Sequence, residues 1–197
     1  MFLLGILGSC NKRLNVAMDR IQESKASNHQ DSMATTLLNR FDLVVGIYRI
    51  PRNIRSQDNY YVAFSKKSAT AYHLKLPVFI STGNNSAIAL DSVPLTRQTY
   101  NEVLDVFDNA ENWNVDYDDT KDEVAMEDCT TRFPGKQCIV IDGPSYLLTF
   151  NTRRKNSHSQ FYAPGRFEEC CPGNPNRKKF MYLKRQFEQI FNLDKPL

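Results

Sequence analysis

The sequence has few of the residues, and none of the local motifs, on which common enzyme active sites depend. It contains only eight glycines and three histidines in 197 residues. A G-x-S-x-G turn, a glycine-rich phosphate loop and an H-E-x-x-H pattern are all missing. We therefore expect a protein that is not an enzyme and uses no cofactor. Because a Ser-His-Asp site can be assembled from distant residues, a hydrolase with an unrecognised active site remains an alternative.

Recognisable metal-binding patterns are missing as well. The cysteines show neither a C-x-x-C spacing nor a histidine at a zinc-ligand distance along the chain. Asp116, Asp118 and Glu127 have the spacing of calcium ligands in an EF-hand loop. Lys121, however, stands at the position where that loop needs glycine. We therefore expect no bound metal.

The sequence also has no large excess of charge of one sign and no long apolar run. The formal net charge is +3, which is too small to indicate nucleic-acid binding by itself. No apolar run approaches the roughly 18 residues that cross a bilayer. By contrast, 41% of the residues are hydrophobic, and the chain carries 12 Phe and 9 Tyr. This length and composition predict one globular domain with a substantial core.

The N-terminal stretch Leu7-Gly8-Ser9-Cys10 resembles the lipobox of bacterial lipoproteins, in which a branched apolar residue and two small residues precede a cysteine. The resemblance implies that residues 1–9 are a signal-like segment that is removed, and that Cys10 is lipidated. Asn11 then implies a periplasmic domain anchored in the outer membrane by its lipid alone. The alternative is a buried apolar element, with Cys10 as a small hydrophobic residue.

The polar composition of residues 10–36 predicts a tether with at most one short helix. Residues 37–197 then form a single α+β domain. Short β-branched and aromatic stretches predict an antiparallel meander; the expected strands are 41–50, 59–64, 70–80 and 86–93, followed by a hairpin of 138–142 with 146–151. Helical stripes predict two helices on one face of this sheet, the second being an amphipathic C-terminal helix that begins at Asn174 and Pro175.

The cysteines other than Cys10 are even in number, as disulfides in an oxidising compartment require. A bond between the adjacent Cys170 and Cys171 is disfavoured by its geometry. We therefore predict that Cys129 and Cys138 each pair with one of them, in an order that the sequence leaves open. Unpaired thiols and a zinc site are the alternatives.

Charge is strongly polarised along the domain. Residues 105–128 hold ten acidic residues and one lysine, whereas residues 153–185 hold nine Lys or Arg and two Glu. Acidic clusters steer partners and embedded aromatic residues anchor them, so we predict a protein-binding surface here; its residues are Trp113, Asp116, Tyr117, Asp118, Asp119 and Glu123, with Arg153, Arg154 and Lys155 as the alternative contact. The plainer interpretation is a solvated acidic loop beside a basic face. Nucleic acid is disfavoured, because the acidic segment repels phosphate.

A tethered domain with disulfides, polarised charge and no catalytic motif is similar to the small lipoproteins that act as immunity proteins. These capture an antibacterial toxin in the periplasm, and some are paired with type VI secretion effectors such as phospholipases. The similarity implies a non-catalytic inhibitor of a protein toxin. An envelope-structural or assembly lipoprotein that binds a resident envelope protein is the alternative, and the hydrolase comes third. The similarity lies in the architecture and the lipobox-like stretch alone, and no family motif covers the domain.

Overall fold

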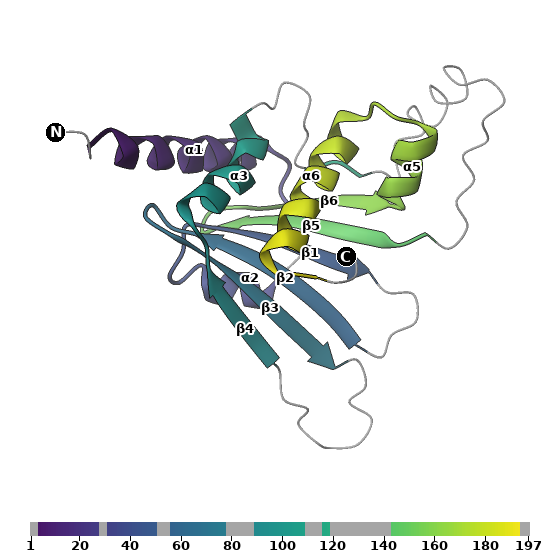
Figure 1. Cartoon of the computed structure of the whole chain (residues 1–197), viewed down its shortest axis with the longest axis horizontal. Coiled ribbons are helices and arrows are strands. Elements are labelled where there is room, and N and C mark those ends of the chain that lie inside the picture. Colours follow the sequence, from purple (N-terminus) through teal and green to yellow (C-terminus); the bar gives the residue numbers. More distant parts are fainter. Residues whose placement is uncertain are drawn as a thin grey trace.

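The computed structural model describes residues 4–27, 31–50, 56–77, 89–108, 116–118 and 143–193. It confirms the predicted α+β class, with an open six-stranded antiparallel sheet and helices packed against it (Figure 1). The described elements are α1 (Leu4–Glu23), α2 (Ser32–Leu37), β1 (Leu43–Ile50), β2 (Ser56–Phe64), β3 (Ala69–Pro77), β4 (Ala89–Pro94), α3 (Arg97–Asp108), β5 (Ser145–Thr152), β6 (Asn156–Tyr162), α5 (Pro164–Cys170) and α6 (Pro175–Ile190).

The strand order in the sheet is β4-β3-β2-β1-β5-β6. The first four strands form the predicted meander, and β5 and β6 extend the sheet on the other side of β1. Of the predicted hairpin, residues 138–142 lie outside the described residues, and residues 146–151 belong to β5, which pairs with β1 on one side and β6 on the other. β5 and β6 form a hairpin, and its turn lies at residues 153–155. The run of basic residues there did not indicate a turn.

One face of the sheet carries the main core. Alternate side chains of the strands, such as Val45, Val62 and Phe150, pack there against α1, α3 and α6. On α6, the predicted stripe is confirmed, since Phe180, Leu183 and Phe187 are all fully buried. Each such side chain contributes about 1.5–3 kcal/mol by leaving water. These contacts fix α6 firmly over the sheet, which matters because α6 forms one wall of the site described below.

The tether predicted at residues 10–36 is wrong. These residues include most of α1, whose Leu14, Ala17 and Ile21 are fully buried in the main core, and all of α2 except its last residue. The three α1 side chains recur every three to four residues and so share one helical face, a pattern that the intervening polar residues obscured. The globular domain therefore begins well before residue 37. No helix within the described residues is long and apolar enough to cross a membrane.

The opposite face of the sheet is covered in part by α2. Asp31 caps this helix by accepting a hydrogen bond from the Ala34 amide at 3.0 Å, and its carboxylate also accepts hydrogen bonds from the hydroxyls of Tyr48 and Tyr61. Gly46 lies beneath, where an added Cβ would come 2.7 Å from the Thr149 hydroxyl oxygen. The buried carboxylate thus holds α2 on the sheet, and glycine leaves room for the polar side chains beside it.

Candidate functional site

The described part of the predicted acidic surface is a short segment, residues 116–118, that lies along the outer edge of β6. Asp118 forms a parallel bridge with Gln160, and the Gln160 amide donates to the Tyr117 carbonyl at 2.8 Å. Asp116 accepts a hydrogen bond from the Lys25 amide at 2.8 Å. This segment therefore continues the sheet and ties the end of α1 to it. Trp113, Asp119 and Glu123 lie outside the described residues.

Tyr117 is not the exposed anchor that we predicted. Its side chain is only 8% exposed, and its ring lies 5.5 Å from that of Phe161 in the main core. Its hydroxyl accepts a hydrogen bond from the Asn174 side-chain amide at 2.9 Å, next to the first turn of α6. The sequence placed this aromatic among charged residues, which suggested exposure. The ring is instead directed inward, while its charged neighbours Asp116 and Asp118 are half-buried.

The basic loop between β5 and β6 is also engaged within the fold. Arg153 donates through Nε to the Leu38 carbonyl at 3.0 Å, and Lys155 donates to the carbonyls of Gln22 and Ser24. These carbonyls belong to the last turns of α2 and α1 or follow them directly, where cations are favourable. Arg153 and Lys155 therefore cap two helices. Arg154 is exposed at the tip of the turn.

The cysteines at the end of α5 are in the oxidised state. Cys170 and Cys171 are both disulfide-bonded. Cys129 and Cys138 lie outside the described residues, so their pairing with Cys170 and Cys171 stays a prediction. Cys10 falls within the helical backbone of α1, and its lipidation likewise stays a prediction.

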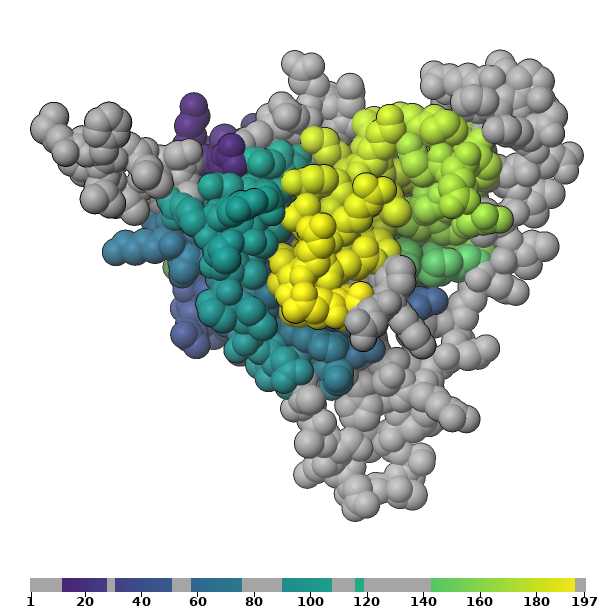
Figure 2. Space-filling view, in the orientation of Figure 1, coloured from purple at the N-terminus to yellow at the C-terminus, as the bar shows by residue number. Residues whose placement is uncertain are grey.

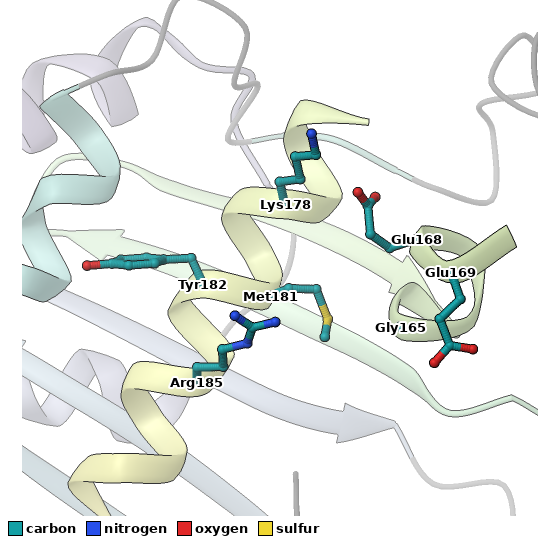
Figure 3. A pocket seen from close by; sticks show the side chains of 7 residues that line it. All are labelled: Gly165, Glu168, Glu169, Lys178, Met181, Tyr182 and Arg185. Carbon is teal, nitrogen blue, oxygen red and sulfur yellow. The ribbon is translucent and has the colours of Figure 1, made fainter. Parts of the chain in front are cut away.

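A groove between α5 and α6 is lined throughout by described residues. It has a volume of about 420 Å³. Figure 2 shows that α3, α6 and α5 lie side by side on one face of the molecule, with α6 in the middle. The groove is lined by Gly165, Glu168 and Glu169 from α5 and by Lys178, Met181, Tyr182 and Arg185 from α6 (Figure 3). Met181 and Arg185 extend from α6 toward α5, so the groove combines an apolar floor with charged walls.

The charges of the groove are only partly neutralised. Glu169 is paired with Arg166 at 2.9 Å, one turn away on the same helix. The side chains of Lys178 and Arg185 are exposed, and neither forms a hydrogen bond or an ion pair with any residue in the described ranges. One wall therefore carries two cations that the other wall does not neutralise.

Glu168 is unusual among these groups. Its Oε1 accepts a hydrogen bond from the Gly173 amide at 3.1 Å, whereas its Oε2 is buried without a hydrogen-bond partner. A buried carboxylate oxygen that lacks a donor costs about 1–3 kcal/mol. Within the part of the chain that the structure describes, Oε2 is therefore an unsatisfied acceptor that is closed off from solvent.

The corner between α5 and α6 sets the shape of the groove. Asn174 caps α6 by accepting hydrogen bonds from the amides of Asn176 and Arg177, and Pro175 occupies the first turn. Gly173 has a φ of 114°, a conformation that side-chain-bearing residues rarely adopt. Arg177 is 3% exposed, donates to the Cys171 carbonyl at 3.2 Å and lies over the Phe167 ring. The corner is thus a rigid element, beside which the two oxidised cysteines lie.

Tyr182 closes the α3 side of this region. Its ring points from α6 toward α3, and its hydroxyl donates to the Glu102 carbonyl at 3.0 Å (Figure 3). Partial burial raises the pKa of Tyr182, and the carboxylates of Asp105 and Glu102 raise it further. The neutral phenol therefore joins α6 to α3 throughout the physiological pH range, and the ring remains 37% exposed.

Two histidine side chains make polar contacts of the kind that catalytic pairs use. The Ser27 hydroxyl lies 2.5 Å from Nδ1 of His158, and the Ser27 amide donates to the Asn156 carbonyl, so the pair joins the α1–α2 linker to β6. His73 contacts the Asp58 carboxylate at 2.9 Å and stacks on Tyr60 within the sheet. Both pairs hold elements together, and neither lines the groove. The described residues also contain no group of three or more acidic, cysteine or histidine side chains placed to bind a metal.

Sequence reasoning missed the groove because its residues are separated into two short helices whose mutual orientation depends on the corner at 171–174. The excess of basic residues after position 153 was the one signal that pointed there. Comparison of the chain with models of protein families, with curated proteins and with solved structures gives no match.

Proposed function

We propose that this protein is a non-catalytic, exported domain that binds and neutralises a protein partner through the groove between α5 and α6. The observation that carries the proposal is the pair of exposed cations that line the groove, Lys178 and Arg185, whose side chains no described residue neutralises. Unpaired charges at the edge of an apolar floor are suited to a protein surface of complementary charge. A rigid scaffold also favours binding, because little conformational freedom is lost on association.

The export of the domain is supported by the oxidised state of Cys170 and Cys171, since disulfides persist in oxidising compartments. The lipobox-like stretch before Cys10 also supports export, and it supports a lipid anchor at Cys10. With Cys10 as the first residue, only three residues would separate the lipid from Leu14 in the core. The anchored domain would then lie directly on the membrane surface, without the long tether predicted from the sequence.

Metabolic labelling with a palmitate analogue tests the anchor. Full-length protein should incorporate the label and fractionate with the outer membrane, and the Cys10→Ser variant should do neither. An unlabelled wild-type protein would contradict the anchor while leaving the binding proposal open to its own test.

The partner that we propose is an antibacterial toxin, such as a phospholipase effector of type VI secretion, and the protein would then act as its immunity protein. Oxidised protein is used to capture partners from periplasmic extract, in parallel with Lys178→Glu/Arg185→Glu. The matched control is Lys66→Glu/Lys67→Glu, which makes the same charge change at the exposed turn between β2 and β3. We expect the captured protein to be an enzyme that is toxic in the periplasm. Wild type and the control should neutralise it, and the groove variant should not.

A harmless resident envelope protein captured in the same way would instead favour the envelope-structural or assembly role. Hydrolysis of ester substrates by the purified protein, abolished by Ser27→Ala, would favour the hydrolase and contradict a non-catalytic function.

A further inference from the structure

The two edges of the sheet differ in how the described residues cover them. At the β6 edge, the Ser27 amide donates to the Asn156 carbonyl at 2.9 Å. Further along the same edge, the Gln160 amide donates to the Tyr117 carbonyl at 2.8 Å. At the opposite edge, β4 pairs with β3 alone, and no described residue pairs with its outer side (Figure 1). Because an uncovered edge strand offers its backbone groups to another strand, β4 is a candidate surface for strand pairing.

The backbone groups that β4 directs outward follow from its pairing with β3. The Leu95 amide donates to the Ala69 carbonyl at 2.9 Å, toward β3. Since amide directions alternate along a strand, the amides of Leu90 and Ser92 point away from β3. Pro94 occupies the next outward position, where its missing N–H removes no hydrogen bond to β3. The outer edge therefore offers the amides of Leu90 and Ser92 and the carbonyl of Pro94.

The side chains of β4 are exposed as well. Leu90 is 46% and Val93 47% exposed, the highest values among the large hydrophobic residues that the structure describes. Leu90 lies beside Leu74 on the face that α2 covers in part, and Val93 lies beside Ala71 on the face of the main core. Apolar side chains at an open sheet edge favour contact with another protein surface.

We infer that β4 pairs with β4 of a second copy of this chain, antiparallel and about a two-fold axis at Ser92. In this register the two Ser92 residues exchange backbone hydrogen bonds, and each Leu90 amide donates to the Pro94 carbonyl of the other copy. The Leu90 side chain then lies against the Pro94 ring of the other copy, on the face next to α2. Each proline stands at a position where only its carbonyl is needed. The outer edge of β4 is therefore complementary to itself, as a two-fold dimer requires.

Two neighbouring registers fit less well. A register centred on Asp91 would set the two carboxylates directly opposite each other, which is unfavourable. A register centred on Val93 would carry the Leu90 amide past Pro94, where β4 ends. The groove is lined by α5 and α6 and not by β4, so each copy in the dimer keeps its own groove. The inference is thus independent of the proposed function.

Sedimentation equilibrium measures the association. The full chain carries Cys10→Ser throughout, so that no lipid can drive it. The interface is small, so the dissociation constant should be on the order of 10–100 µM. Ser92→Pro removes the outward amide at the two-fold axis, and with it two hydrogen bonds between the copies, so it should weaken association about tenfold or more. Ser92→Ala keeps that amide and, as the matched control, should associate like wild type.

Single cysteines test the register, and they do so even if Ser92→Pro fails to fold. Ser92→Cys places the two new thiols opposite each other, with Cα atoms about 5.5 Å apart, which is within disulfide range. Mild oxidation should therefore join two copies through position 92, as mapped by mass spectrometry of the digested dimer. Asp91→Cys and Val93→Cys should crosslink at least about fivefold less, because their Cα atoms lie beyond that range.

Three results would overturn the inference. The first is a wild-type protein that stays monomeric at about 500 µM, well above the expected dissociation constant. The second is crosslinking through position 91 or 93 in preference to 92. The third is a monomeric protein in which Ser92→Pro abolishes capture of the partner, which would assign the edge of β4 to a strand of that partner. Loss of capture by the groove variant alone would leave the dimer unaffected.

Discussion

Residues 116–118 and the groove between α5 and α6 both combine charged side chains with an aromatic ring, yet they differ in what those groups contact. In the segment, Tyr117 is buried against Phe161, and Asp116 accepts a backbone hydrogen bond. In the groove, Lys178 and Arg185 have no partner among the described residues. Charge density in a sequence therefore does not by itself identify a binding surface. What matters is which charges the fold leaves unsatisfied.

Substitution of Tyr117 is expected to have the largest effect on stability. Tyr117→Ala removes a buried ring and the hydrogen bond from Asn174, so it should lower the free energy of unfolding by about 3–5 kcal/mol. Tyr117→Phe keeps the ring and should cost only about 1 kcal/mol. Urea denaturation followed by circular dichroism measures both. If Tyr117→Ala were as stable as wild type, the segment would be a surface loop after all.

Alkaline pH provides a second test, directed at the sheet under the end of α6. Burial raises the pKa of Tyr60 to about 12, with a further contribution from the Asp58 carboxylate, and the ring lies 5.0 Å from that of Phe191. Since the unfolded phenol ionises near pH 10, the folded state holds this proton more tightly. The stability from neutral Tyr60 is therefore complete below pH 10 and is lost as the pH rises toward 12.

Thermal unfolding at a series of alkaline pH values measures this loss. Tyr60→Phe should show a shallower decline above pH 10 than wild type, with part of the decline remaining because burial also raises the pKa of Tyr61 and Tyr146. Identical pH profiles for the two proteins would contradict the buried placement of Tyr60.

The basic turn between β5 and β6 should show a smaller effect. Lys155→Ala removes the cation that binds the carbonyls at the end of α1, and we expect a loss of about 1 kcal/mol in unfolding free energy. Arg154→Ala, at the exposed tip of the same turn, is the matched control and should be neutral. Equal effects of the two substitutions on the denaturation midpoint would argue against the capping role of Lys155.

The groove should show the smallest effect on stability. Lys178→Glu/Arg185→Glu breaks no interaction within the described residues, so its unfolding free energy should lie within about 0.5 kcal/mol of wild type. A large loss of stability in the same denaturation assay would show that these cations serve the fold. Tyr117→Ala should lower stability and leave binding at the groove intact. Lys178→Glu/Arg185→Glu should do the reverse, weakening binding and leaving stability unchanged.

The sequence allowed the fold class, most strands and both predicted helices to be anticipated, because β-branched and aromatic residues mark β1 and a helical pattern marks α6. It failed at α1, where three apolar residues among polar ones looked like a tether, since the partner helix α3 lies about 90 residues further on. It failed at Tyr117 for a related reason. Whether one aromatic residue points inward depends on Phe161 and Asn174, which a local pattern does not place.

Hydrogen–deuterium exchange of the protein with and without its captured partner tests the central claim most directly. The account predicts that binding slows exchange in peptides covering residues 165–185, while exchange in the segment 116–118 is unchanged. Protection confined to peptides around residues 116–118, with α5 and α6 unaffected, would contradict the assignment of the groove as the binding surface.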